Sequence, residues 1–285
     1  MFPFPLILDG AIGDELFLRG YNTDLPLWAT TPLLEHPSAV LKLHQDYVQA
    51  GAQVLTANTF RTHFRTLYRA HYSDRMLELN TLAVSLAQQA LGSKQGWVAG
   101  SIAPLEDCYR PDLVPSDYEL EVEHLLQSQQ LLEASADLLL IETMNCIREA
   151  RIALRCAKQT SLPVWVSFLV TEKMTLPSGE KLADAYNAVI SLEPDLILAN
   201  CFPLKILPDL FPLLTSFSFP FGLYPNLGKQ EFQGVWDRNR LVHREQTYVE
   251  AMSRSLNEGA IVVGGCCGTG PQHIHALTQH LKSLT

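Results

Sequence analysis

Residues 138–169 read LLLIETMNCIREARIALRCAKQTSLPVWVSFL, and this stretch indicates the fold class. Two short apolar runs, Leu138–Glu142 and Val164–Leu169, have the length and composition of buried strands. The segment between them, Ile147–Gln159, is predicted to be a helix. A strand, a helix and a second strand in this order predict a βαβ unit, whose two strands run parallel.

The same alternation continues along the whole chain of 285 residues. Further strands are predicted at Pro5–Asp9, Gln53–Ala57, Trp97–Ser101, Asp195–Asn200, Phe221–Tyr224 and Ala260–Val263. Further helices are predicted at Pro37–Ala50, Asp74–Leu91, Ser116–Ser135, Lys181–Ser191, Leu207–Thr215, Arg244–Asn257 and onward from Pro271. Eight strand–helix pairs without a linker predict one closed (β/α)8 barrel of the TIM type, a single domain over residues 1–285. The alternative is an open doubly wound sheet, but no G-x-G-x-x-G motif follows the first strand.

The composition disfavours several classes of protein. Lys and Arg number 21 against 30 Asp and Glu, so the net charge is −9, and binding to nucleic acid is not expected. No apolar run reaches the ~20 residues that cross a bilayer, and the N-terminus lacks the basic segment of a signal peptide. Six cysteines are too few for a disulfide scaffold, so we expect a cytoplasmic protein with free or metal-bound thiols. We expect small-molecule partners, and the sequence carries no signal for an oligomeric state.

Polar side chains and thiols gather at the carboxyl ends of the predicted strands. Barrel enzymes hold their active sites at these ends. The residues at these ends are Asp9, Asn58, Ser101, Glu142, Asn200, Cys201, Asn226, Cys266 and Cys267.

Three of the cysteines form a candidate metal site. Cys201 follows the sixth predicted strand, and Cys266 and Cys267 follow the eighth within VVGGCCGTGP, residues 262–271. The glycines of this segment allow turns that direct two adjacent thiols to one point. Three protein ligands with an open fourth position are typical of a catalytic zinc. The alternative is that the three cysteines are small buried hydrophobic residues.

The remaining cysteines and the C-terminal histidines are interpreted as structural. Cys108, Cys146 and Cys156 have no second ligand nearby in sequence, so we expect them to be buried hydrophobic residues. His273 and His275 lie past the first turn of the final predicted helix, where packed or solvated roles are expected.

Seven segments, spread over nearly the whole chain, carry a recognisable set of motifs. They are LDGAIGDEL from Leu8, GAQVLTANTF ending at Phe60, VAGSIAP ending at Pro104, LLLIET ending at Thr143, ANCF around Cys201, YPNLG ending at Gly228 and GGCCGTGPQHI ending at Ile274. Together they resemble the homocysteine S-methyltransferase family, whose members are zinc-dependent thiol methyltransferases. The resemblance implies that Cys201, Cys266 and Cys267 bind zinc. The chain departs from the family pattern near the expected mouth, where a Gly, a Ser and a Glu are replaced by Leu198, Leu227 and Lys229.

The resemblance implies transfer of a methyl group to the thiol of homocysteine, giving methionine. Zinc bound by three thiolates is a soft site that stabilises a substrate sulfur as thiolate. The chain is too short for additional folate- and cobalamin-binding domains, so we expect a small-molecule methyl donor. A sulfonium such as S-methylmethionine is favoured, and betaine is the alternative.

Further residues are predicted to bind the substrates. Glu142 is the expected partner of the homocysteine ammonium, and Asp9 either shares that role or holds the first loop in place. The segment Pro225–His243 is long for a barrel loop, and Trp236 within it either offers the donor a cation–π contact or packs on the barrel rim. Thr143 either donates a hydrogen bond to substrate or caps the following helix. Polar groups that can orient substrate or make structural hydrogen bonds are Asn58, Ser101 and Asn200.

Two other functions are compatible with a barrel. The chain can be a non-catalytic zinc or thiol binder, for which the changes at Leu198 and Leu227 are the support. It can also be a metal-free barrel enzyme such as an aldolase, which requires a lysine at a strand end. None of the eight predicted strands contains or ends in a lysine, so the zinc methyltransferase is favoured.

Overall fold

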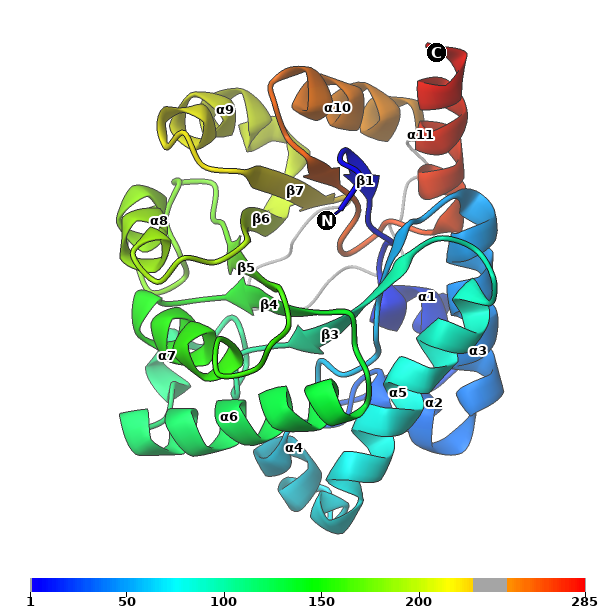
Figure 1. Ribbon diagram of the computed structural model, residues 1–285, viewed down its shortest axis with the longest axis vertical. Helices are drawn as coiled ribbons and strands as arrows, with labels where there is room; N and C mark the ends of the chain where they lie inside the picture. Colours follow the sequence, from blue (N-terminus) through cyan, green and yellow to red (C-terminus); the bar gives the residue numbers. More distant parts are fainter. Residues whose placement is uncertain (1, 228–244, 285) are drawn as a thin grey trace.

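Eight parallel strands form a ring in the computed structural model, which describes residues 2–227 and 245–284 (Figure 1). Seven of the neighbouring pairs form ladders in the order β1-β8-β7-β6-β5-β4-β3-β2. A bridge between Leu8 and Val54 closes the ring between β1 and β2. The strands are β1 (Leu6–Ile7), β2 (Val54–Thr56), β3 (Trp97–Ile102), β4 (Leu138–Met144), β5 (Val164–Leu169), β6 (Leu196–Pro203), β7 (Phe221–Asn226) and β8 (Val262–Val263). The predicted TIM-type barrel is thereby confirmed, and the open sheet is excluded.

Helices surround the ring of strands, as Figure 1 shows. Eight of them correspond to predicted helices: α3 (Pro37–Ala50), α5 (Met76–Leu91), α6 (Asp117–Glu133), α7 (Ile147–Ala157), α8 (Leu182–Ile190), α9 (Leu207–Ser216), α10 (Glu245–Asn257) and α11 (Pro271–Ser283). Three short helices were not predicted: α1 (Ile12–Leu18), α2 (Thr30–Glu35) and α4 (Phe64–Arg69). Helices of one or two turns have too few residues to show a clear apolar period.

The predicted boundaries are mostly correct, with two informative differences. Ser116 and Glu119 form the predicted capping box at the start of α6. The helix predicted from Asp74 begins instead as a 3₁₀ turn, Ser73–Arg75, and α5 starts at Met76. Strand β6 continues to Pro203, so Cys201 lies inside the strand rather than after it.

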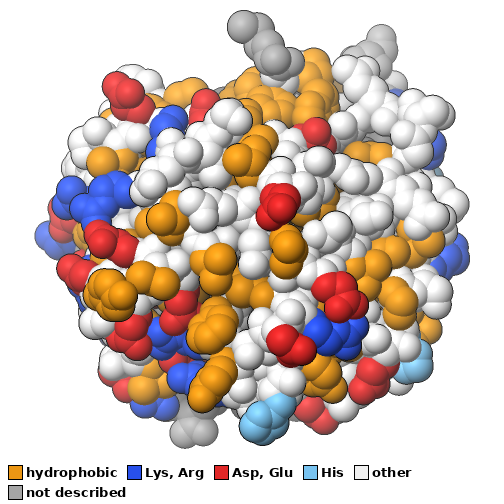
Figure 2. All heavy atoms as spheres, turned by 60° about the horizontal axis from the view of Figure 1, so that its bottom comes forward, with side chains coloured by type: hydrophobic (Ala, Val, Ile, Leu, Met, Phe, Trp, Pro, Cys, Tyr) orange, Lys and Arg blue, Asp and Glu red, His pale blue; other side chains and the backbone are white. Residues whose placement is uncertain are grey.

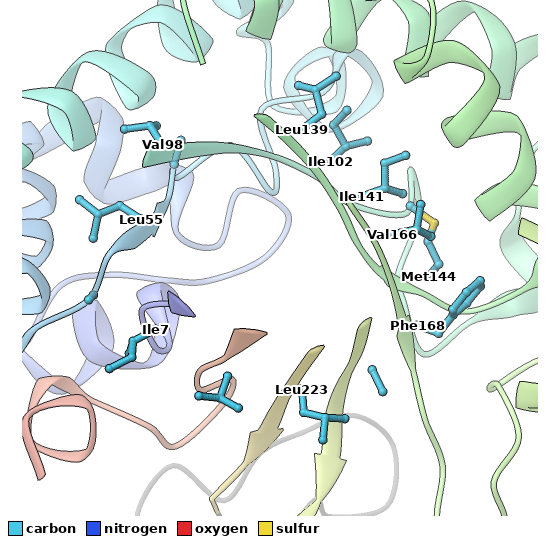
Figure 3. Close-up of a cluster of buried hydrophobic side chains, with 14 of the residues drawn as sticks. Ile7, Leu55, Val98, Ile102, Leu139, Ile141, Met144, Val166, Phe168 and Leu223 are labelled. Atoms are coloured by element: carbon cyan, nitrogen blue, oxygen red, sulfur yellow. The ribbon is translucent and has the colours of Figure 1, made fainter. Parts of the chain in front are cut away.

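Side chains alternate between the inside and the outside of the barrel. Along β4, Leu138 and Leu140 belong to a buried cluster that contains no helix residue, so this cluster fills the barrel interior. Leu139 and Ile141 belong to the larger cluster that packs against the helices, and Figure 3 shows both with neighbouring strand residues of this layer. Each fully buried leucine or isoleucine contributes about 1.5–3 kcal/mol to stability. The fold is therefore held by two apolar layers, one on each side of the sheet.

Aromatic rings occupy the amino-terminal end of the barrel. The ring of Phe2 lies 5.3 Å from that of Trp97 and 5.4 Å from that of Trp165, both in edge-to-face geometry. Trp97 is the first residue of β3, and Trp165 is the second residue of β5. The opposite end, where the strands finish, carries the polar side chains.

No membrane-spanning helix occurs in the described part of the chain, and the face drawn in Figure 2 carries no large basic patch. In residues 2–227 and 245–284, no helix combines the length and the apolar character needed to cross a bilayer. Figure 2 shows one face, where acidic, basic and hydrophobic side chains are interspersed and basic ones form only small groups.

Candidate active site

The carboxyl ends of the strands open onto a cavity of about 210 Å³. A barrel places the end of every strand around one mouth, so residues far apart in sequence meet there. Most of the predicted site residues line this cavity: Asp9, Asn58, Ser101, Glu142, Thr143, Cys201, Cys266 and Cys267. Asn200 and Asn226 are buried but do not belong to the lining.

The three predicted metal ligands converge in the cavity. The sulfur atoms of Cys201, Cys266 and Cys267 all lie within 4.8 Å of one another, and no other cluster of this kind occurs among the described residues. Tetrahedral zinc with bonds of about 2.3 Å to sulfur places its ligand atoms about 3.8 Å apart, so the three thiols suit a metal ion. The convergence of the three thiols was therefore predicted correctly from the sequence.

Two of the three sulfurs, those of Cys201 and Cys266, lie in direct contact. The Cα atoms of these two cysteines are 5.6 Å apart. Sulfurs that converge on one point can bond to each other when they are oxidised. Because a metal binds thiolate, the reduced pair is the form that can hold an ion.

Irregular backbone directs Cys201 to the mouth. The register between β6 and β7 shifts between Asn200 and Pro203, and Cys201 has a φ of 52°. Thr143 in β4 has a φ of 60° and also lies at a register shift. Left-handed backbone costs a residue with a Cβ about 1–3 kcal/mol and is concentrated at functional sites. The surrounding contacts must therefore hold both residues in place.

Asn200 joins these two irregular strands. Its Oδ1 accepts hydrogen bonds from the Thr143 backbone N at 3.2 Å and from the Ser167 Oγ at 2.7 Å. Its Nδ2 donates to the Thr143 Oγ1 at 2.9 Å. Since the cap residue of α7 is Cys146, the alternative that Thr143 caps this helix is wrong. Asn200 thus positions the strand that carries Cys201.

The turn that carries Cys266 and Cys267 is held by hydrogen bonds from two other parts of the chain. The Cys266 backbone N donates to the Pro225 carbonyl at 2.9 Å, and the Leu227 N donates to the Cys267 carbonyl at 2.9 Å. The Gly268 N donates to the Asp14 carboxylate at 2.9 Å, and Gly268 has a φ of 76°, which glycine adopts without strain. The N-terminal motif and the end of β7 therefore fix the two thiols.

Glu142 is a buried carboxylate with two hydroxyl donors. The Ser101 Oγ donates to one carboxylate oxygen at 2.5 Å, and the Tyr224 hydroxyl lies 3.4 Å from the other. Burial raises the pKa of Glu142 to about 7, although both hydroxyl groups act in the opposite direction. A buried carboxylate that is half ionised near neutral pH is stabilised by a cation entering the pocket.

Asp9 is also buried, and both its oxygens are already bonded to β2. They accept from the Thr56 backbone N at 2.8 Å and from the Thr56 Oγ1 at 2.9 Å. Burial raises the pKa of Asp9 well above its usual value, and the nearby charge of Glu142 adds to this. Asn58 lines the same side of the cavity and donates from its Nδ2 to the Ala29 carbonyl at 2.8 Å. Asp9 and Asn58 therefore connect the first two strands and the segment before α2 at the mouth.

Several lining residues were not predicted as functional. Trp28 and Phe60 form an edge-to-face aromatic pair with ring centres 5.3 Å apart, and Tyr109 and Arg61 lie in the same lining. Tyr224 is a further addition, because its hydroxyl contacts Glu142. Phe60 and Tyr224 belong to the motifs TANTF and YPNLG, so these motifs are the signal that could have identified them. Trp28, Arg61 and Tyr109 lie in loops, and no local pattern marks them.

The predictions for the remaining residues have mixed outcomes. Trp236 and residues 228–243 of the predicted Pro225–His243 loop lie outside the described residues. Cys108 is buried as expected, but it packs with the cysteine cluster instead of lying apart from it, and burial raises the pKa of its thiol to about 12. His273 accepts a hydrogen bond from the Gly270 N at 3.0 Å, which is a structural role at the start of α11.

Fold and site together define a (β/α)8-barrel enzyme whose mouth can hold a metal ion on three cysteines. The family model for homocysteine S-methyltransferases matches residues 6–281, and the chain belongs to this family. The family membership that the sequence motifs implied is thus confirmed.

Individual relatives agree with this assignment. The chain is 30% identical to homocysteine S-methyltransferase YbgG of Bacillus subtilis (strain 168) over 304 residues, covering 99% of this chain and 96% of that protein. It is also 30% identical to the homocysteine S-methyltransferase of Escherichia coli (strain K12), covering 95% and 94%. Its fold is similar to the crystal structure of the metallated form of the homocysteine methyltransferase MmuM from Escherichia coli, with a TM-score of 0.81, 26% identity and 96% of each chain covered.

Proposed function

We propose that the protein is a zinc enzyme that transfers a methyl group from a small sulfonium compound to the thiol of homocysteine, giving methionine. S-methylmethionine is the proposed donor. The observation that carries this proposal is the convergence of the Cys201, Cys266 and Cys267 sulfurs within 4.8 Å of one another. These sulfurs share a cavity with the buried carboxylate of Glu142.

Zinc fits this set of donors because it prefers sulfur and nitrogen ligands in tetrahedral geometry. The three cysteines would bind it in their reduced form and leave one position open. When bound, zinc would hold the homocysteine sulfur as a thiolate and so supply the nucleophile. The relative MmuM has been solved in a metallated form, which supports a metal ion in this chain.

Glu142 is the proposed partner of the homocysteine ammonium. Its carboxylate is buried and is oriented by Ser101. Because its pKa is about 7, binding of an ammonium would shift it toward the ionised form. Asp9, a second buried acid at the mouth, would hold β2 in position through its two hydrogen bonds with Thr56.

The proposed donor is a cation, and the described lining is suited to one. Attack of a thiolate on a sulfonium methyl group releases a neutral sulfide, so positive charge leaves the pocket during the reaction. Asp9, Asp107 and Glu142 place carboxyl groups around the cavity. Trp236 stays a proposed contact of the sulfonium, supported only by the affinity of aromatic faces for cations.

A donor panel tests the proposed function. Reduced, zinc-loaded protein is incubated with homocysteine and either S-methylmethionine or betaine, and methionine is followed by mass spectrometry. We expect turnover with the sulfonium, and none by the Cys266→Ala/Cys267→Ala variant, which serves as the metal-free control. Turnover with betaine alone would overturn the proposed donor, and full activity of the double variant would overturn the proposed metal site.

A further inference from the structure

One cationic side chain lies close to several acidic ones in the described part of the cavity lining. Among the described residues of the lining, four are acidic: Asp9, Asp14, Asp107 and Glu142. Arg61 is the single lysine, arginine or histidine in that set. A positive charge in such a pocket is an expected partner for an anionic group of a ligand, because charge complementarity selects the orientation of bound molecules.

The environment of Arg61 differs from that of the arginines that follow it. Its guanidinium carbon lies 5.6 Å from the centre of the Phe60 ring, and its Nη1 donates to the backbone carbonyl of Glu106 at 3.3 Å. Arg65 and Arg69 instead bind the Glu106 carboxylate, at 2.8 Å and 2.6 Å. No carboxylate among the described residues forms an ion pair with Arg61. Among the described residues, the guanidinium of Arg61 contacts only the Phe60 ring and the Glu106 carbonyl, so most of its five N–H donors have no partner in that part of the chain.

We propose that Arg61 binds the carboxylate of the methyl donor and thereby selects sulfonium compounds that carry a carboxylate. This inference rests on the proposed methyl transfer. Homocysteine would be held at its thiol by the cysteines and at its ammonium by Glu142, so its own carboxylate, on the same carbon as the ammonium, would lie near β4. Arg61 lies instead in the loop after β2, beside Phe60. A guanidinium binds a carboxylate through two parallel hydrogen bonds, which fix the direction of the donor as well as its affinity.

Steady-state kinetics on the reduced, zinc-loaded enzyme test the proposal by changing each of the two groups in the contact, the Arg61 guanidinium and the donor carboxylate. The variant Arg61→Gln removes the charge, and the methyl ester of S-methylmethionine removes the carboxylate charge of the donor. We expect the variant to raise the KM for S-methylmethionine by tenfold or more and to leave the KM for homocysteine within twofold. The ester should lose about the same factor with wild-type enzyme, and the variant should show no further loss with the ester. Such non-additivity identifies two groups that interact directly.

Two further variants test whether the effect of Arg61→Gln comes from the lost contact with the donor. Arg61→Lys keeps a charge but loses the planar fork, so it should restore part of the donor affinity. Arg75→Gln is the matched control, because its guanidinium pairs with Glu78 on the surface at 2.6 Å and should change neither KM. Thermal melting and metal content show whether each variant is folded and loaded.

Several results would overturn the proposal. One is that the losses of donor affinity caused by Arg61→Gln and by the methyl ester add up when the two are combined. Another is that Arg61→Gln changes the KM for homocysteine instead of the KM for the donor. If the wild-type enzyme turns over no donor, the proposed function fails, and calorimetric titration of S-methylmethionine into wild-type and Arg61→Gln protein then decides the inference separately. Equal affinities, or no binding by wild-type protein, would contradict a role for Arg61.

Discussion

Replacing Glu142 by glutamine should stabilise the protein at alkaline pH and at the same time weaken homocysteine binding. Burial raises the pKa of Glu142 from 4.5 to about 7, so the folded state binds this proton more tightly than the unfolded state does. The free energy of unfolding of the wild type therefore falls as the pH rises from 4.5 through 7. At pH 8 the full cost of ionising the buried carboxyl is about 3 kcal/mol, because each pKa unit corresponds to about 1.4 kcal/mol.

Glutamine avoids this cost and keeps the shape of the site. Its amide oxygen can still accept the hydrogen bond from Ser101, which lies 2.5 Å from a carboxylate oxygen of Glu142. It cannot supply the negative charge on which the proposed contact with the homocysteine ammonium depends. Loss of a charge-assisted hydrogen bond costs about 1.5–3 kcal/mol, which is about a ten- to hundredfold increase in the dissociation constant.

Urea denaturation of wild type and Glu142→Gln at pH 5 and pH 8 measures the first effect. The advantage of the variant should grow by about 2.5 kcal/mol between the two pH values, because most of the ionisation occurs in this interval. Calorimetric titration of homocysteine into the reduced, zinc-loaded proteins measures the second effect. Glu78→Gln is the control, because Glu78 lies on the surface and pairs with Arg75.

Two results would refute this reasoning. If the stability difference between variant and wild type is the same at pH 5 and pH 8, Glu142 does not titrate near neutrality. If the homocysteine dissociation constant is unchanged in the variant, Glu142 does not bind the ammonium, and zinc content should confirm that the site is intact.

The remaining predictions concern the metal ligands and the backbone around them. Metal analysis of reduced protein should find about one zinc per chain, and the double variant Cys266→Ala/Cys267→Ala should lose it; zinc retained by that variant would contradict the assignment. Gly265→Ala places a Cβ on the Thr269 hydroxyl, so chemical denaturation should show a loss of about 1–3 kcal/mol; unchanged stability would mean that the turn adapts freely. Asn200→Ala should cost about 1–3 kcal/mol by leaving a buried backbone N–H unpaired and should weaken zinc binding in competition with a chelator, whereas unchanged zinc affinity would limit Asn200 to a structural role.

Much of the barrel was predictable because buried parallel strands and amphipathic helices leave strong local patterns. Leu138–Glu142 is apolar over almost its whole length, since both faces of β4 are buried. The short helices α1 and α4 carry no comparable pattern, and they were missed. The end of β6 was misjudged because the polar Asn200 suggested a strand terminus, whereas its side chain is satisfied inside the barrel by Ser167 and Thr143.

Some residues of the candidate site could be predicted from the sequence, and others could not. The cysteines could be recognised because thiols at two strand ends, with glycines around them, suit a metal. Arg61 and Trp28 could not be recognised, because no local pattern marks a loop residue that faces a pocket. The position of Cys108 was also not predictable, because its neighbour Cys201 is distant in sequence and only the closure of the barrel brings them together.

By itself, the sequence determined the alternation of strands and helices, the family, and which three cysteines converge at the mouth of the barrel. The tertiary structure alone decided that Glu142 is a buried acid with a pKa of about 7 and that Asn200 holds two strained strands together. It also decided that Arg61 lies with four acidic residues in the described part of the cavity lining. The physical reason is that hydrophobic periodicity is a pattern of residues adjacent in sequence. Burial, pKa values and charge complementarity depend instead on groups that become neighbours only when the ring of strands closes.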